Sequence, residues 1–324
     1  MVVAHRVEHV VLPSPALGTR RELAVHRFGD AGARPKAYIQ AGLHAGEIPG
    51  LLVAHHLIGR LRRAAEAGAL RGEVVVVPTA NPIGLAQHVL GRHIGRFELA
   101  GGVNFNRAYP ALAERAGELL AGRLTADAAA NRNLVQAALR EALAGRRAPT
   151  EAAALRLALM ALAVDADIVL DLHCDNESEL HVYMATQAWP GAADLAAELG
   201  AAVVLLASES GGNPFDESIS APWAKIAGQF GGATPVPADG CLAATVELRG
   251  SADVNHALAA GDAAALERFL RRRGVLAGTA TALPHWPGEA TALAAVDVIA
   301  SPVAGVLVHA RHLGARLKSG DTVA

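Results

Sequence analysis

Short apolar runs alternate with helix-like stretches along most of this chain, and this alternation restricts the folds open to it. The runs have the length of buried strands and lie at residues 23–28, 37–41, 73–77, 168–172, 203–206 and 244–248, and the helical stretches lie at 51–63, 192–199 and 254–273. Strands that alternate with helices favour a sheet that is at least partly parallel. We therefore predict an α/β fold with a mixed, partly parallel sheet, helices on both faces, and a ligand site at the carboxyl ends of the strands.

One block departs from the alternation. Residues 111–163 are rich in alanine and arginine, and their leucines recur at helical spacing. We interpret the block as two or three helices inserted between strands. It is either a cap over the site or an oligomer face, and a solvated helical decoration fits the same pattern.

Composition and charge exclude several classes of partner. The net charge is −2, and lysine occurs only at Lys36, Lys225 and Lys318, so we expect no nucleic-acid partner. The first ten residues lack the apolar core of a secretory signal, and no apolar run approaches the ~20 residues of a membrane helix. The two cysteines, Cys174 and Cys241, form no disulfide framework and suit a reducing compartment. We expect a cytoplasmic protein without a membrane partner.

The first candidate site element lies where an apolar strand passes into a helix. Gly42 allows a sharp turn, and Pro49 suits the first turn of the helix that follows. His44 and Glu47 are three residues apart, a spacing that points both side chains the same way. A neutral imidazole and a carboxylate both suit zinc, although each alone could equally be a polar group at a helix entry.

A third ligand candidate ends a later apolar strand. His173 should emerge at the same carboxyl edge as His44 and Glu47, although it could equally be a hydrogen-bonded histidine at a strand end. Two histidines and one carboxylate form a three-ligand set that leaves a fourth zinc position open for water. Asp171, which shares the face of His173, or Asp175 beyond it, is placed to orient an imidazole.

Two further elements carry polar groups suited to catalysis. A glycine-containing loop bears Arg96, Asn104, Asn106 and Arg107, whose guanidinium and amide groups could clamp a carboxylate or stabilise an oxyanion. An arginine-bearing surface loop is the plain alternative. Glu247 ends the last apolar strand. A glutamate there usually faces solvent, but beside a zinc-activated water it is placed to act as a general base.

In this order, the elements resemble the succinylglutamate desuccinylase/aspartoacylase family, relatives of the zinc carboxypeptidases. The resemblance covers most of residues 35–255. It rests on His44-x-x-Glu47, Asn104-Phe-Asn106-Arg107, Asp171-Leu-His173 and Thr245-Val-Glu247. It implies one zinc per chain, bound by His44, Glu47 and His173, with Glu247 as the general base.

The resemblance also implies roles for the loop. Asn106 and Arg107 match the pair that holds the substrate carboxylate, and Asn104 in the same motif is assigned to substrate binding. Arg96 resembles the arginine that polarises the scissile carbonyl. Arg92 is the alternative for that role, because the spacing from Arg96 is longer than in aspartoacylases and the motif reads Asn-Phe-Asn-Arg where the family commonly has Asp-Leu-Asn-Arg.

The tail has a different character. Prolines mark a linker near residue 284, and two apolar segments, 296–300 and 303–309, predict short strands. The resemblance implies a small β-barrel-like domain there. We expect a catalytic domain at 1–280, which includes the helical block, and a small all-β domain at 281–324. One interpretation is that this second domain is incomplete, because a further strand is expected.

These observations predict a zinc-dependent amidohydrolase that removes the acyl group from a small N-acyl amino acid. One alternative is a metallocarboxypeptidase that acts on short peptides. The other is a non-catalytic scaffold or binding protein with bound zinc, against which Glu247 argues, because a structural zinc site needs no free carboxylate beside it. A homo-oligomer is compatible with either the enzyme or the scaffold.

Overall fold

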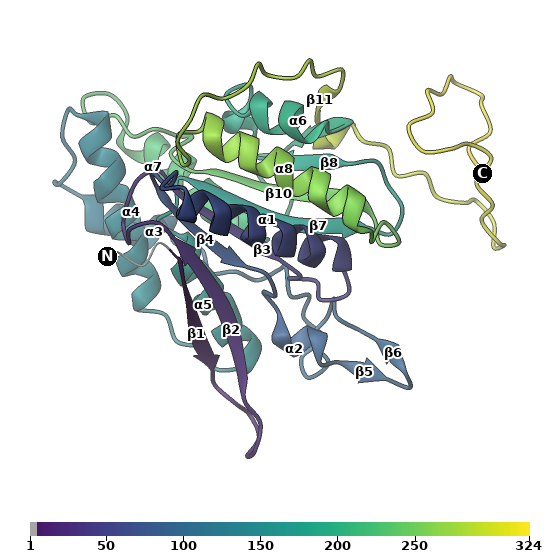
Figure 1. The fold of residues 1–324 in the computed structure, drawn as a ribbon, viewed down its shortest axis with the longest axis horizontal. Coiled ribbons are helices and arrows are strands. Elements are labelled where there is room, and N and C mark those ends of the chain that lie inside the picture. Colours follow the sequence, from purple (N-terminus) through teal and green to yellow (C-terminus); the bar gives the residue numbers. More distant parts are fainter. Residues whose placement is uncertain (1–4) are drawn as a thin grey trace.

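A mixed sheet runs through residues 5–324, the part of the chain that the computed structural model describes (Figure 1). Its nine strands lie in the order β1-β2-β4-β3-β7-β10-β8-β9-β11. They are β1 (His5–Leu12), β2 (Arg21–Phe28), β3 (Lys36–Ala41), β4 (Glu73–Val77), β7 (Ile168–Asp175), β8 (His181–Met184), β9 (Val203–Leu206), β10 (Leu242–Gly250) and β11 (Glu289–Ala292). Strands β4, β3, β7 and β10 are parallel neighbours, whereas β1 with β2, β2 with β4, and β8 with β10 pair antiparallel. The predicted partly parallel sheet is confirmed, and all six predicted runs lie in its strands.

Helices cover both faces of the sheet, as predicted (Figure 1). One layer consists of α1 (Ile48–Glu66), α6 (Ala193–Leu199) and α8 (His256–Arg272), and the other of α3 (Ala113–Leu120), α4 (Ala128–Ala144), α5 (Glu151–Ala163) and α7 (Phe215–Phe230). Successive strand residues point to opposite faces, so Ile39 joins one hydrophobic core and Tyr38 the other. Within residues 5–324, no helix is both long enough and apolar enough to cross a membrane.

The block at 111–163 forms α3, α4 and α5 and completes the second core. Leu139 and Leu159 are fully buried there together with Val169 of β7, which excludes a solvated decoration. The expected cap is also wrong, because the cavity at the strand ends, described below, is lined by none of residues 111–163. Helices with a broad apolar face gain more by covering the open face of a sheet than by covering a polar site. The oligomer face stays a prediction.

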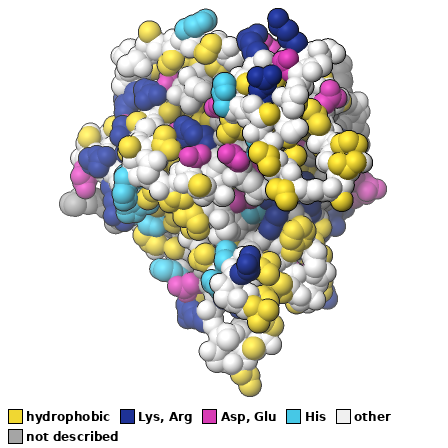
Figure 2. Space-filling view, turned by 90° about the vertical axis from the view of Figure 1, so that its right-hand side faces the viewer, with side chains coloured by type: hydrophobic (Ala, Val, Ile, Leu, Met, Phe, Trp, Pro, Cys, Tyr) yellow, Lys and Arg dark blue, Asp and Glu magenta, His cyan; other side chains and the backbone are white. Residues whose placement is uncertain are grey.

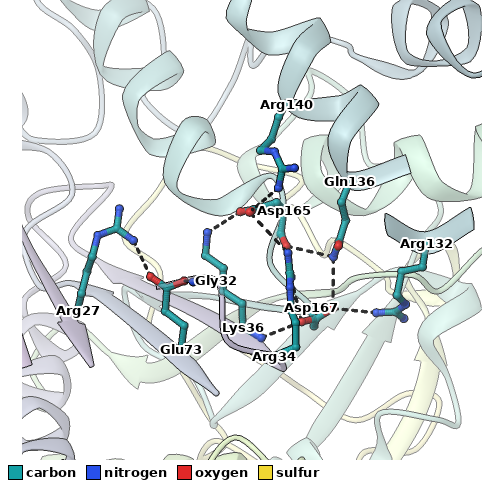
Figure 3. Close-up of polar contacts among 10 residues, drawn as sticks. All are labelled: Arg27, Gly32, Arg34, Lys36, Glu73, Arg132, Gln136, Arg140, Asp165 and Asp167. Carbon is teal, nitrogen blue, oxygen red and sulfur yellow. Dashed lines mark hydrogen bonds and ion pairs between the residues drawn. The ribbon is translucent and has the colours of Figure 1, made fainter. Parts of the chain in front are cut away.

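Charged side chains tie α4 to the amino ends of the central strands (Figure 3). Asp167, just before β7, accepts hydrogen bonds from Arg132 at 3.0 Å and from the backbone N–H of Lys36 at 2.7 Å. Asp165 pairs with Arg140 at 2.9 Å and with the Lys36 ammonium at 2.5 Å. The helical block is therefore anchored at the edge of the sheet opposite to the strand ends that carry the candidate ligands.

The tail differs from the predicted β-barrel-like domain. Strand β11 joins the edge of the main sheet beside β9, and residues 296–324 contain no strand. The predicted strands at 296–300 and 303–309 are not formed. Their apolar side chains stay exposed, with Val298 at 93% and Val306 at 91%. An apolar segment becomes a strand only where another strand accepts its backbone hydrogen bonds, and here it has no such partner.

Candidate active site

The loop after β3 carries the first two candidate ligands. Gly42 has φ of +72°, a left-handed conformation that glycine adopts without steric cost, and it turns the chain out of the strand. Gly50, in the first turn of α1, lies close to β7, where an added Cβ would approach the carbonyl oxygen of Leu172 to 2.8 Å. The two glycines thus bring His44 and Glu47 to the end of β7.

The structure brings His44, Glu47 and His173 together. Nδ1 of His44 lies 2.9 Å from Oε1 of Glu47, and Nδ1 of His173 lies 2.7 Å from Oε2 of the same carboxylate. One potential ligand atom from each residue lies within 4.8 Å of the other two. All three side chains are largely buried. Two imidazoles and one carboxylate form one of the donor sets that zinc favours.

In both histidines Nδ1 faces the Glu47 carboxylate, and Nε2 lies against another side chain. Nε2 of His44 lies 2.8 Å from the amide oxygen of Asn104, and Nε2 of His173 makes a 2.9 Å ion-pair contact with Asp171. Such partners orient the histidines of metal sites. Asn104 differs from the prediction that it binds substrate. Its oxygen also accepts the backbone N–H of Asn106, and its side chain does not line the cavity.

The charges of this cluster suit a bound cation. Burial would raise the pKa of the Glu47 carboxyl, but hydrogen bonds from His173 and His44 hold that pKa well below its ordinary value. Burial would likewise lower the pKa of His173, but Asp171 and Glu47 raise it well above the ordinary value. Two carboxylates flank one imidazole in a buried place, which favours positive charge between them. The residues therefore fit a divalent metal ion.

The Glu247 carboxylate lies beside the triad of His44, Glu47 and His173. It is the register partner of His173 on β7 and of His181 on β8. Its Oε2 is buried and has no hydrogen-bond partner within residues 5–324. Burial raises the pKa of Glu247 to about 7, and Glu47 contributes to the rise although the His173 charge opposes it. A carboxyl that titrates near neutral pH suits a general base.

Arg96 and Arg107 occupy different positions in the site, and Arg92 lies outside it. Arg96 is exposed and donates to Oε1 of Glu47 at 3.0 Å, at the mouth of the cluster. Arg92, the alternative, lies in the short strand β6 (Arg92–His93), which pairs with β5 (His88–Val89), and does not line the cavity. Arg107 lines the cavity, and its hydrogen bond is to the carbonyl of Asn106, so its charge has no acidic partner within residues 5–324.

Asn106 has a role that the sequence did not indicate. Its amide oxygen accepts the backbone N–H of Phe215 at 2.8 Å, at the start of α7. The two segments that contain Asn106 and Phe215 are joined a second time, because the backbone N–H of Ala108 donates to the carbonyl oxygen of Gly212 at 2.8 Å. Asn106 lines the cavity as predicted for a substrate contact, but it also fixes α7 to the arginine-bearing loop.

Several residues that sequence reasoning did not single out line the cavity, among them Tyr183, Asp216 and Leu293. Tyr183 on β8 is the register partner of Thr245, so the apolar-polar alternation of its strand could have indicated it. Asp216 lies in the first turn of α7, and acidic residues are so common there that its position carried no signal. Leu293 comes from the tail, just after β11.

These side chains enclose one cavity of about 370 Å³. Besides the residues above, it is lined by Cys174, Asp175, Met184, Leu205, Ala207, Ser210, Pro214 and Glu217. Figure 2 shows the face of the molecule at the carboxyl ends of the central strands. Basic and acidic side chains are intermixed on this face, with apolar side chains between them. A small cavity that holds charges of both signs can bind a small, charged molecule.

The chain is similar to known proteins in sequence and in fold. Residues 33–145 match the family model of the succinylglutamate desuccinylase/aspartoacylase catalytic domain. A Shewanella amazonensis protein assigned to this family is 29% identical, with a TM-score of 0.84 over 98% of this chain and 86% of that chain. A second one, from Shewanella frigidimarina, is 26% identical, with a TM-score of 0.83 over 99% of this chain and 85% of that chain.

A more distant structure shares the fold. The product-bound ectoine utilization protein EutE (DoeB) from Ruegeria pomeroyi is 13% identical, with a TM-score of 0.57 over 88% of this chain and 71% of that chain. No curated protein matches the chain significantly.

Proposed function

Because the chain belongs to the succinylglutamate desuccinylase/aspartoacylase family, we propose that it hydrolyses the amide bond of a small N-acyl amino acid with the help of one zinc ion. The ligands would be His44, Glu47 and His173. The observation that carries the proposal is the meeting of this triad with Glu247, whose buried Oε2 has no hydrogen-bond partner among residues 5–324.

The residues divide the chemistry between them. Zinc in this place would supply a Lewis acid and lower the pKa of a water molecule to about 7. Glu247 takes the proton of the attacking water and passes it to the leaving nitrogen, so the amide is released as a free amine and a carboxylate. Arg96, which already reaches Glu47, donates hydrogen bonds to the oxyanion that develops on the carbonyl oxygen.

Arg107 supports an amino-acid substrate. Its guanidinium lines the cavity and has no acidic partner in the described part of the chain, and a planar pair of N–H donors matches a carboxylate. The fixed position of the loop, through Asn106 and α7, keeps this arginine at a constant place relative to the triad. An α-carboxylate bound there would orient the acylated nitrogen toward Glu247.

The cavity has the size of a site for a small molecule. A volume of about 370 Å³ is near the lower end of ligand pockets, which span about 300–1,000 Å³. A scaffold would not need a carboxyl poised near neutral pH beside its metal.

The test combines metal analysis with a substrate screen. The purified protein should contain or take up one zinc per chain, and it should hydrolyse some acetyl-, succinyl- or formyl-amino acid and lose that activity with a chelator. Dipeptides should be poorer substrates. Zinc uptake without any hydrolysis would favour the scaffold, and faster cleavage of dipeptides would favour the carboxypeptidase.

A further inference from the structure

The cavity contains an acidic side chain that the proposed chemistry does not use. Asp216 lies in the first turn of α7 and lines the cavity together with the triad. First-turn acids usually sit in solvent, where they interact with the helix dipole. Asp216 is only 7% exposed, so it loses hydration that such residues normally keep. A simple role at the helix start does not explain this burial.

The carboxylate of Asp216 lacks a basic partner. Within residues 5–324, no lysine, arginine or histidine forms an ion pair with it, and no side chain donates a hydrogen bond to it. The hydrogen bond that it accepts comes from the backbone N–H of Glu217. The ionisable groups that face it are Glu217 on its own helix and Asp171 and His173 on β7. Two of the three are acidic, and His173 is already in contact with Glu47 and Asp171. Buried carboxylates in folded proteins are usually paired.

Asp216 and Arg107 line the cavity from two segments that are hydrogen-bonded to each other. Asn106 accepts the backbone N–H of Phe215, and the next residue on each segment carries a charge, Arg107 on one and Asp216 on the other. The backbone bond from Ala108 to Gly212 fixes the same two segments a second time. The cavity therefore presents a cation and an anion in a constant arrangement.

We propose that Asp216 is a specificity subsite for a positively charged side chain, so that the preferred substrates are N-acyl derivatives of amino acids that end in an amine or a guanidine. This inference rests on the proposed function. Arg107 binds the α-carboxylate of such a substrate, and Asp216 binds the cation at the other end. The two charges then select a zwitterionic amino-acid part, whichever acyl group is removed.

The experiment measures substrate preference and binding with the zinc-loaded protein. Nα-acetyl derivatives of 2,4-diaminobutyrate, ornithine, lysine and arginine are compared with those of norleucine and glutamate, and the screen is repeated with succinyl and formyl groups. The best basic substrate should exceed the norleucine analogue in kcat/KM by at least about 30-fold, because a buried charge pair contributes roughly that much or more. Asp216→Asn should reduce this advantage to a few-fold, mainly by raising KM, while the norleucine derivative changes little.

A matched control and a second readout separate this subsite from the proposed function. Glu209→Gln removes one negative charge from the exposed loop before α7, outside the cavity, and should keep the basic preference. Calorimetry with free lysine, ornithine and norleucine measures binding of the product side without turnover. The free basic amino acids should bind more tightly than norleucine, and Asp216→Asn should abolish the difference.

Each outcome decides one of the two proposals. Hydrolysis that favours glutamate or norleucine derivatives, or a basic preference that survives in Asp216→Asn, overturns the subsite and leaves the deacylase intact. If no N-acyl amino acid is hydrolysed, the proposed function fails, and the calorimetry alone decides the subsite. Equal binding of lysine and norleucine would then overturn it.

Discussion

Glu247 and His173 are direct register partners on the adjacent parallel strands β10 and β7, so a carboxylate and a metal-ligand candidate leave the sheet side by side. The pairing explains how two residues that are 74 positions apart in the sequence can serve one site. Because each projects from a strand in the middle of the sheet, their separation is set by backbone hydrogen bonds rather than by flexible loops. The predictions below separate the ligands, the base and the binding residues of this arrangement.

Removal of a ligand should remove the metal and the activity together. His173→Ala takes away one of three donors, so zinc content per chain and hydrolysis should fall in parallel. Asp171→Asn, which weakens the contact behind His173, should lower zinc affinity by about 10–100-fold. His88→Ala, at the exposed β5–β6 hairpin, is the control and should keep full zinc content. Full occupancy in His173→Ala would exclude His173 from the site. The measurement is elemental analysis with a competing chelator.

Removal of the base should separate binding from chemistry. Glu247→Gln keeps the shape of the side chain but cannot accept a proton, so zinc and substrate should still bind while kcat falls by roughly 10²–10⁴-fold. Steady-state kinetics and zinc analysis of the same preparation measure both effects. An unchanged kcat would show that Glu247 takes no part in the reaction.

Substitution of Arg107 should affect N-acyl amino acids more than the corresponding amino-acid amides. Arg107→Lys keeps the charge but loses the planar pair of donors, so KM for N-acyl amino acids should rise by about tenfold or more. The corresponding amino-acid amides carry no charge at that position and should be nearly unaffected. Arg92→Lys, outside the cavity, serves as the control. Equal losses for acids and amides would assign Arg107 to the structure of the site or to the transition state.

Asp216 should destabilise the protein above neutral pH. Burial, with help from Asp171 and Glu217, raises the pKa of Asp216 from 3.8 to about 6, and the His173 charge opposes the rise. The folded state therefore holds the proton more tightly than the unfolded chain. Its contribution to stability is fully present below pH 3.8 and is lost as the pH rises through about 6.

Asp216→Asn should consequently be more stable than the parent chain at pH 8, by up to about 3 kcal/mol. The gain should shrink as the pH falls through 6 toward 4. Urea unfolding of both proteins across this range measures it. A gain that does not change with pH, or a loss at pH 8, would contradict the burial of an ionised Asp216.

The ion pairs of Asp165, at the amino ends of the central strands, should stabilise the protein at high pH and lose this effect at low pH, the reverse of Asp216. Burial would raise the pKa of Asp165, but Lys36, Arg140 and Arg34 hold it below its ordinary value of 3.8. Because the folded-state pKa is depressed, the contribution of Asp165 is present above 3.8 and is lost as the pH falls through the lower folded-state pKa.

Asp165→Asn should therefore lower the free energy of unfolding at pH 7, and the difference from the parent should shrink only below about pH 4. Glu118→Gln, which breaks an exposed ion pair with Arg115, is the matched control and should have little effect. If both variants lose the same stability, the link from α4 to the sheet is no stronger than a surface pair. Urea titrations between pH 3 and 7 provide the comparison.

Much of the fold and the candidate metal triad could be predicted from the sequence because both depend on local patterns. An apolar run such as 168–172 forms a strand wherever it is buried, and the polar residue that follows it emerges at the sheet edge. His44 and Glu47 needed only a turn and a helix start. Prediction was wrong where the local pattern leaves the packing partner open. The apolar helices of 111–163 could cover a site or a sheet, and the segments at 296–300 and 303–309 lacked a strand to join.

By itself, the sequence determined six of the nine strands of the main sheet, the helices α1, α6 and α8, the helical block at 111–163 and the three candidate ligands, because backbone periodicity and side-chain chemistry are properties of neighbouring residues. Only the tertiary structure decided that Asn104 holds His44, that Arg96 rather than Arg92 reaches the cluster, and that Asp216 faces the cavity. These facts depend on which distant segments meet. A side chain on a loop or in a first helical turn has no function that its neighbours in sequence can reveal, since its environment is formed by residues from other parts of the chain.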